Sequence, residues 1–187
     1  MTKIIIIPGS SREGSFNRKL ASSIAKSVES HGATATEVNL SDYPMPIFNE
    51  DWESENGAPA EAKALAQLIA EHQGVVFVTP EYNASLPPLL KNTIDWLSRG
   101  VGVKVYQDRV FALAACSPGG LGGIRCLSHL RDVLLNVGAE MITPQIAVGQ
   151  ANTAFNEDMT LSNERTAGML DGLSATLVGR IKSASTT

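Results

Sequence analysis

Five short apolar segments separated by amphipathic stretches constrain the fold of this chain more than any other feature. The apolar or β-branched segments are residues 3–8, 33–39, 74–79, 109–115 and 141–148. The intervening stretches repeat apolar residues every three or four positions, as in Phe16, Leu20, Ile24 and Val28, which is the spacing of a buried helix face. A third helix is expected over residues 87–99, and Gly138 is placed like a helix C-cap. Alternating strands and helices predict an α/β fold with a parallel sheet between two helical layers.

The composition of the five strands predicts their order. The first, third and fourth segments are almost continuously apolar, as expected for strands covered on both faces. The second alternates polar and apolar residues and the fifth contains Pro144, so both suit the edges of a sheet. These positions match the flavodoxin-like order 2-1-3-4-5, a three-layer sandwich that would occupy residues 1–187 as one domain. A six-stranded dinucleotide fold is disfavoured because no sixth strand is visible.

The loop after the first strand has the composition of a phosphate site. Residues 9–17 read Gly-Ser-Ser-Arg-Glu-Gly-Ser-Phe-Asn and lead directly into a predicted helix. Such a turn gathers free backbone N–H groups at the positive end of the helix dipole, and here it adds hydroxyl, amide and guanidinium donors. It matches neither the P-loop nor the dinucleotide fingerprint. An ordinary serine-rich strand-to-helix turn is the alternative interpretation.

Two further loops have unusual compositions. Residues 79–88 read Thr-Pro-Glu-Tyr-Asn-Ala-Ser-Leu-Pro-Pro, and residues 117–123 read Ser-Pro-Gly-Gly-Leu-Gly-Gly. In the predicted order, strands one, three and four are neighbours, so the loops at residues 9–17, 80–87 and 116–124 meet where ligands of such sheets bind.

Together these three motifs resemble the NAD(P)H-dependent FMN reductase family of flavodoxin-like proteins, and most of all its quinone, azo-dye and chromate reductase branch. The resemblance covers residues 3 to about 137. It implies that FMN is the cofactor and NAD(P)H the co-substrate. The acceptor would be a small molecule: a quinone, an azo compound, free flavin or a chromate-type oxidant.

The resemblance also implies a role for individual residues. The FMN phosphate would lie on Ser10, Arg12, Ser15 and Asn17, with backbone help near Phe16. The ribityl chain and the ring edge would lie along Pro80, Glu81, Tyr82 and Asn83. The pyrimidine side of the ring would approach Ser117, Gly119 and Gly120, whose backbone can come close to a flat heterocycle.

Several of these residues also have an alternative interpretation. Tyr82 could cap the core, Glu81 could accept backbone N–H groups near the third helix, and the glycines of residues 119–123 could form a linker. Arg125 either pairs with an exposed acid or contacts the cofactor or an anionic substrate across a subunit boundary.

Flavin chemistry requires no obligatory side-chain acid or base, so no residue is assigned as catalytic. NAD(P)H and the acceptor are expected to use the same exposed ring face in turn. A non-enzymatic electron carrier or flavin sensor is the main alternative, and a flavin-free hydrolase or phosphate-binding module is a weaker one. Arg12 and the modest acidity favour the reductase over a carrier.

The composition bears on the partners, the location and the metal content expected of the protein. The chain has 15 Lys and Arg against 19 Asp and Glu, a net charge of −4, which offers no basic surface for nucleic acid. Without a signal-like or membrane-like segment, a cytoplasmic location is expected. Cys116 and Cys126 match no metal or redox motif, and no metal site is predicted.

A homodimer or homotetramer is expected from a long apolar loop at residues 42–52. Exposed Met45, Ile47, Phe48 and Trp52 would be a costly patch on a monomer. The third helix, with Trp96 and Leu97, is expected to meet its counterpart across a two-fold axis.

Overall fold

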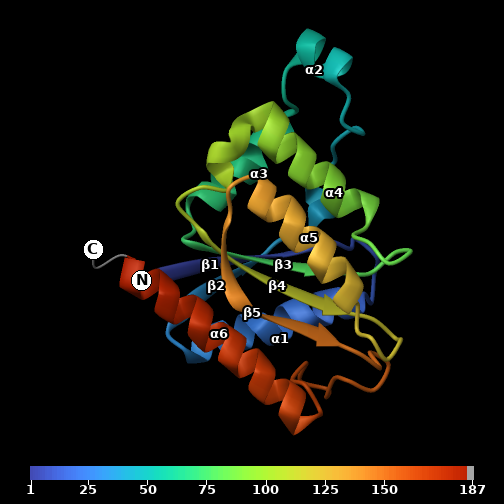
Figure 1. The fold of residues 1–187 in the computed structure, drawn as a ribbon, viewed down its shortest axis with the longest axis vertical. Helices are drawn as coiled ribbons and strands as arrows, with labels where there is room; N and C mark the ends of the chain where they lie inside the picture. The colour runs from blue at the N-terminus through green and yellow to red at the C-terminus, as the bar shows by residue number, and fades with distance from the viewer. Residues whose placement is uncertain (185–187) are drawn as a thin grey trace.

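The computed structural model, which describes residues 1–184, is built on one all-parallel sheet (Figure 1). Its strands are β1 (Thr2–Pro8), β2 (Ala33–Glu37), β3 (Gly74–Thr79), β4 (Val110–Cys116) and β5 (Glu140–Val148). They lie in the order β2-β1-β3-β4-β5, which confirms the predicted flavodoxin-like fold. Every residue of β3 and β4 is buried, whereas β2 and β5 are only partly buried, so the strand compositions had indicated the correct edges.

Helices cover both faces of the sheet (Figure 1). The helices α1 (Phe16–Ser30) and α6 (Glu164–Ala184) pack on one face, where Ile4 and Ile6 of β1 meet them. On the other face, α3 (Ala60–Ala70), α4 (Pro88–Asp95) and α5 (Ile124–Asn136) cover Ile5 and Ile7. The four successive isoleucines therefore divide between two cores. Within residues 1–184, no helix combines the length and the apolar character that crossing a bilayer requires.

The edge strand β5 contains an irregularity at Pro144. Phe111 of β4 pairs with Met141, but Leu113, two residues on, pairs with Gln145, so β5 carries extra residues at this point. Arg131 of α5 donates to the carbonyl of Ile142 and to the side chain of Gln145. The prolyl residue is thus accommodated by a bulge whose polar groups a neighbouring helix satisfies.

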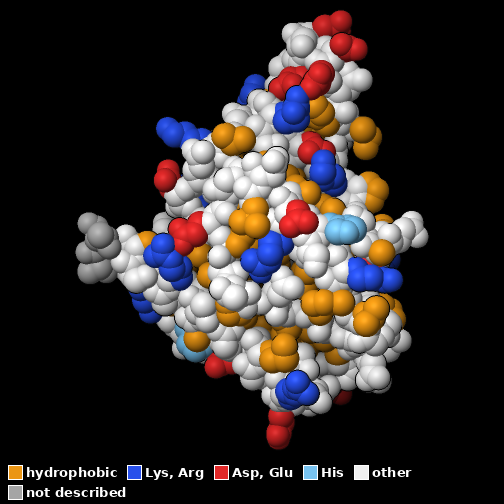
Figure 2. All heavy atoms as spheres, in the orientation of Figure 1, with side chains coloured by type: hydrophobic (Ala, Val, Ile, Leu, Met, Phe, Trp, Pro, Cys, Tyr) orange, Lys and Arg blue, Asp and Glu red, His pale blue; other side chains and the backbone are white. Residues whose placement is uncertain are grey.

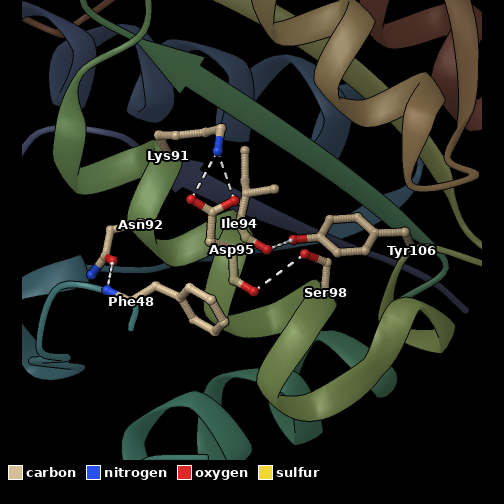
Figure 3. Close-up of polar contacts among 7 residues, drawn as sticks. All are labelled: Phe48, Lys91, Asn92, Ile94, Asp95, Ser98 and Tyr106. Carbon is tan, nitrogen blue, oxygen red and sulfur yellow. Dashed lines mark hydrogen bonds and ion pairs between the residues drawn. The ribbon is translucent and has the colours of Figure 1, made fainter. Parts of the chain in front are cut away.

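The helical path after α4 differs from the predicted single helix. It continues as a π-helix, Trp96–Gly102, and then as the 3₁₀ turn η3 (Val103–Val105). A side chain at Gly100 would lie 2.7 Å from the Trp96 ring, so glycine lets this wide turn close over the indole. The hydroxyl of Tyr106 donates to the Ile94 carbonyl, and that of Ser98 to the Asp95 carbonyl, at the point where the hydrogen-bond pattern changes (Figure 3).

Residues 43–59, called the arm below, project from the layer of α3 and α4 (Figure 1). The 3₁₀ turn η1 (Leu40–Asp42) precedes the arm, and α2 (Glu50–Asn56) lies within it, whereas the sequence had predicted only a loop. Asn92 holds the arm by accepting from the Phe48 N–H and donating to the Pro46 carbonyl (Figure 3 shows the first bond). The Trp96 indole also donates to the Pro46 carbonyl, at 2.7 Å.

That the third predicted helix meets its counterpart across a two-fold axis stays a prediction, but Trp96 and Leu97 do not supply that contact. Trp96 and Leu97 are each 0% exposed in the single chain, because they pack beneath the arm and against the core. Neither side chain can therefore meet a counterpart across a two-fold axis.

Candidate functional site

Three loops leave the carboxyl ends of the adjacent strands β1, β3 and β4. They are the first rim loop (residues 9–17), the second rim loop (residues 80–87) and the third rim loop (residues 117–123). A cavity of about 160 Å³ lies between the first two. Gly9, Ser10, Ser11 and Arg12 line one side of it, and Tyr82 with residues 87–89 lines the other. The predicted meeting of the first two loops is therefore a real cavity at the rim of the sheet.

The first rim loop has the geometry of an anion site. Ser15 is the N-cap of the 15-residue helix α1, and its hydroxyl accepts from the Asn17 N–H. Within residues 1–184, the backbone N–H groups of Ser10, Ser11 and Arg12 have no hydrogen-bond partner. The Arg12 side chain is exposed beside them. Free N–H groups, a helix N-terminus and a guanidinium on one cavity wall form a site suited to a phosphate.

Asn17 has a different environment from the one expected for a phosphate ligand. It is 3% exposed, and its amide Nδ2 donates to the Cys116 carbonyl at 2.9 Å. Its Oδ1 accepts from the Cys116 N–H, also at 2.9 Å. The side chain is therefore engaged with the end of β4, and a phosphate contact by Asn17 stays a prediction.

The second rim loop contains a tight turn. Tyr82 and Ser85 exchange two backbone hydrogen bonds across Asn83 and Ala84, whose φ angles are 49° and 65°. Asn tolerates this left-handed conformation, whereas Ala rarely adopts it. Tyr82 is 53% exposed, so the interpretation that it caps the core is wrong, and its ring lines the cavity instead. Pro80 is half-buried at the entry to this loop.

Glu81 joins the second rim loop to helix α5. Its carboxylate accepts from Arg125 Nε at 2.8 Å and from the Cys126 N–H at 3.4 Å, at the N-terminus of α5. The hydrogen bond from Arg125 lowers the pKa of Glu81. A structural carboxylate had been expected near the third predicted helix, but Glu81 serves the fourth. Being charged at neutral pH, it accepts hydrogen bonds and does not act as a proton donor.

Arg125 pairs with an acid, as the first alternative expected, but that acid is not exposed; a contact with the cofactor or an anionic substrate across a subunit boundary stays a prediction. Its partner Glu81 belongs to the same chain, and that side chain is only 9% exposed, whereas the Arg125 side chain is 56% exposed. The guanidinium thus pairs with a sheltered acid of the candidate site and keeps much of its surface in solvent.

The glycines of the third rim loop divide into two kinds. Gly122 has φ +62°, and a Cβ there would lie 2.7 Å from the Gly149 nitrogen, so this glycine packs tightly on the end of β5. A Cβ at Gly120 would meet nothing within 4 Å. Ser117, at the start of the loop, bonds through its N–H to the Val148 carbonyl and through its carbonyl to the Ala151 N–H. The linker interpretation is wrong, because this loop is anchored at both ends and is open only at its middle.

The cysteines do not offer a reactive thiol. Burial raises the pKa of Cys116 to about 12 and that of Cys126 to about 11, so both stay protonated at neutral pH. Within residues 1–184, no three His, Cys, Asp or Glu side chains are grouped as a metal site would require.

Sequence reasoning missed a second cavity, of about 380 Å³, between the third rim loop and the start of α6. Gly120 lines it together with polar side chains that include Gln150, Thr153, Ser162 and Thr166. The available signal was the polar stretch at residues 149–163, which is longer than a strand-to-helix turn needs.

The sheet order, the anion-binding turn after β1 and the adjoining cavity define a class: flavodoxin-like α/β proteins that bind a phosphorylated ligand at the sheet rim. Comparison with known proteins narrows this class. A family model described as NADPH-dependent FMN reductase matches residues 2–153. The chain belongs to this family.

Individual relatives agree with the family assignment. The chain is 37% identical over 137 residues to a quinone reductase of Escherichia coli, covering 73% of this chain and 71% of the relative. It is also 37% identical over 131 residues to a 2-hydroxy-1,4-benzoquinone reductase of a Burkholderia species, covering 70% and 69%. Among solved structures, FerB of Paracoccus denitrificans, a flavoenzyme NAD(P)H:(acceptor) oxidoreductase, superimposes with a TM-score of 0.84. That match has 30% identity and covers 98% of each chain.

Proposed function

We propose that this protein is a reductase that holds FMN at the rim of its sheet and uses NAD(P)H to reduce quinones. The observation that carries the proposal is the cavity that the first rim loop shares with Tyr82, since it offers phosphate donors and an aromatic surface side by side. The family membership and the quinone reductases among the relatives support the same chemistry. FMN, when bound, would supply the electron transfer itself.

The residues of the rim fit the parts of FMN. Ser10, Arg12 and Ser15, with the backbone near Phe16, would hold the phosphate, because that turn has free N–H groups and a positive charge. Pro80, Tyr82 and Asn83 would lie along the ribityl chain and ring edge, and Tyr82 provides an exposed flat surface. Ser117, Gly119 and Gly120 would approach the ring, because the middle of that loop has room.

The charged pair next to the rim has a supporting role in this proposal. Glu81 and Arg125 hold the second rim loop against α5 and keep a fixed orientation of the Tyr82 turn. Because Glu81 stays ionised, no side chain of the rim loops is assigned as a proton donor. The chemistry then depends on how the rim loops position the ligand.

Purified protein incubated with FMN tests the proposal. We expect FMN fluorescence to be quenched on binding, NAD(P)H to bleach the bound flavin, and 1,4-benzoquinone to restore its colour. Absence of FMN binding would contradict the proposal. Binding without bleaching by NADH or NADPH would instead favour the electron-carrier alternative.

We also propose that the arm mediates a homodimer or homotetramer. Its Ile47 is 76% exposed and its Trp52 is 37% exposed. Acidic residues Glu50, Asp51 and Glu53 gather near the same end of the molecule (Figure 2). Exposed apolar side chains on a projecting arm are costly in water unless a second surface covers them. Light scattering should report a multiple of 19.8 kDa, and a shift toward the single-chain mass in Ile47→Asp would locate the contact. A cytoplasmic location stays a prediction.

A further inference from the structure

Asn17 links two of the three rim loops. It is the second residue of α1, two positions after the Ser15 N-cap of the first rim loop. Its side-chain partner, Cys116, is the last residue of β4 and directly precedes the third rim loop. The two residues are 99 positions apart, and both members of the reciprocal pair of hydrogen bonds are 2.9 Å long.

The sheet explains why Cys116 needs such a partner. Ala115 is the last β4 residue paired with β3, opposite Thr79. The strand β3 ends at Thr79, so no β3 residue lies opposite Cys116. Cys116 is only 2% exposed, so its backbone N–H and carbonyl depend on partners within the protein and not on water. The Asn17 amide supplies one acceptor and one donor, and so takes the place of a further strand residue.

The same two bonds leave Asn17 poorly placed to bind a phosphate. The residue is 3% exposed, its Oδ1 is occupied, and one of its two amide hydrogens is already donated to a carbonyl. Exposed Arg12 and the unpartnered N–H groups of the first rim loop are available to an anion instead.

We propose that Asn17 is a positioning residue that fixes the third rim loop relative to the first, so that the phosphate site and the ring site stay at a set separation. The inference rests on the proposed function, since it assigns the first loop to the FMN phosphate and the third to the flavin ring. The two possible roles of Asn17 differ in their consequence. If Asn17 positions the third rim loop, its loss weakens binding of the flavin ring as much as binding of FMN. If Asn17 were a phosphate ligand, its loss would weaken binding of FMN alone.

Comparing FMN with riboflavin, which lacks the phosphate, tests this distinction. In Asn17→Ala, two buried backbone groups lose their hydrogen bonds to the amide, and we expect the dissociation constants of both flavins to rise about tenfold or more. Their ratio should stay within about twofold of the wild-type ratio. Arg12→Gln is the opposite case: FMN binding should weaken about tenfold or more while riboflavin binding is unchanged. Selective loss of FMN binding in Asn17→Ala would overturn the proposal, and so would unchanged affinity for both flavins.

Hydrogen exchange of the flavin-free protein gives a measurement that is independent of the ligand. In Asn17→Ala the hydrogen-bonded amides of Cys116 and Ser117 should exchange at least about tenfold faster, while those in the middle of α1 keep their wild-type rates. Uniform acceleration, or none, would overturn the proposal. If Asn17→Ala does not fold, Asn17→Ser provides the same tests, because its hydroxyl can retain one of the two bonds.

Asn92 offers a matched control. Its amide makes the same kind of reciprocal contact, with the Phe48 N–H and the Pro46 carbonyl, but in the arm (Figure 3 shows the bond to Phe48). Asn92→Ala should speed exchange in the arm and leave both flavin affinities unchanged. Failure of the wild-type protein to bind either flavin would refute the proposed function, whereas the exchange experiment would still decide whether Asn17 fixes the third rim loop.

Discussion

Two glycines in the third rim loop, two positions apart, should respond in opposite ways to the same substitution. At Gly122 the backbone is left-handed, with φ +62°, and a Cβ would lie 2.7 Å from the Gly149 nitrogen and 2.7 Å from the Val148 carbonyl carbon. At Gly120 a Cβ would meet nothing within 4 Å, and φ is outside the left-handed region. Substitution by alanine should therefore introduce strain and close contacts at Gly122, whereas at Gly120 the added methyl group has room.

The expected cost at Gly122 follows from these distances. The left-handed conformation costs an alanine about 1–2 kcal/mol. A contact with fixed backbone adds about 1–3 kcal/mol, as in an overpacked core. Alanine also lowers the conformational entropy of the unfolded chain, which stabilises the folded protein by about 0.4–1 kcal/mol. The free energy of unfolding of Gly122→Ala should fall by about 2–4 kcal/mol, which lowers Tm by about 4–16 °C for a chain of this length.

Gly120→Ala should leave the free energy of unfolding unchanged or raise it by up to about 1 kcal/mol, because only the unfolded chain loses freedom. Its FMN affinity should fall, since the added methyl group occupies the room assigned to the ring. Thermal and urea unfolding of both flavin-free variants, with FMN titration of Gly120→Ala, check these expectations. Equal stability losses at the two positions, or a loss under about 1 kcal/mol at Gly122, would refute the reasoning.

Three further predictions concern the second rim loop and the thiols. Glu81→Gln should lower the free energy of unfolding at pH 7 by about 1 kcal/mol, discounted because Arg125 is largely exposed. Since the folded pKa of Glu81 lies below its ordinary value of 4.5, this difference should persist above pH 4.5 and disappear as the pH falls further, and urea unfolding across pH would show it. Ala84→Gly should raise Tm by about 1–4 °C, because glycine removes the strain of the 65° φ angle, and calorimetry that finds destabilisation contradicts this. Native protein at pH 8 should react with a thiol reagent much more slowly than unfolded protein, because both cysteines are buried; fast labelling of the native state would argue against it.

The strand order could be predicted because the burial of a strand determines which residue types it contains. β1, β3 and β4 are covered on both faces for most of their length and are almost continuously apolar, whereas the sequence of β2 alternates and β5 contains Pro144. The bulge that accommodates Pro144 could not be predicted, because it depends on Arg131 reaching across from α5.

Two helical features escaped prediction for local reasons. The helix α2 has no buried residue, so it lacks the apolar periodicity that identifies a helix. Its signals were only an Asn49 N-cap, acidic residues in the first turn and Gly57 after the end. The π-helix after α4 depends on how Trp96 packs on Gly100, and this contact leaves no apolar repeat in the sequence.

The composition of the rim loops indicated a ligand site, but not the partners of individual side chains. The family resemblance implied that Asn17 contacts the FMN phosphate. In the structure its amide bonds to Cys116, which lies 99 positions away and one residue beyond the last pair of β3 with β4. Glu81 likewise pairs with Arg125, 44 positions later. Such assignments require knowing where two strands end relative to each other.

Both tryptophans of the chain belong to one corner of the molecule. Trp52 of the arm and Trp96 at the start of the π-helix have ring centroids 5.5 Å apart, and neither lines the cavity at the first two rim loops. Intrinsic indole emission therefore reports on the junction of the arm with α4. A fluorescence melt would record detachment of the arm, and circular dichroism would follow the sheet and its helices, so comparing their midpoints measures whether that corner unfolds together with the rest.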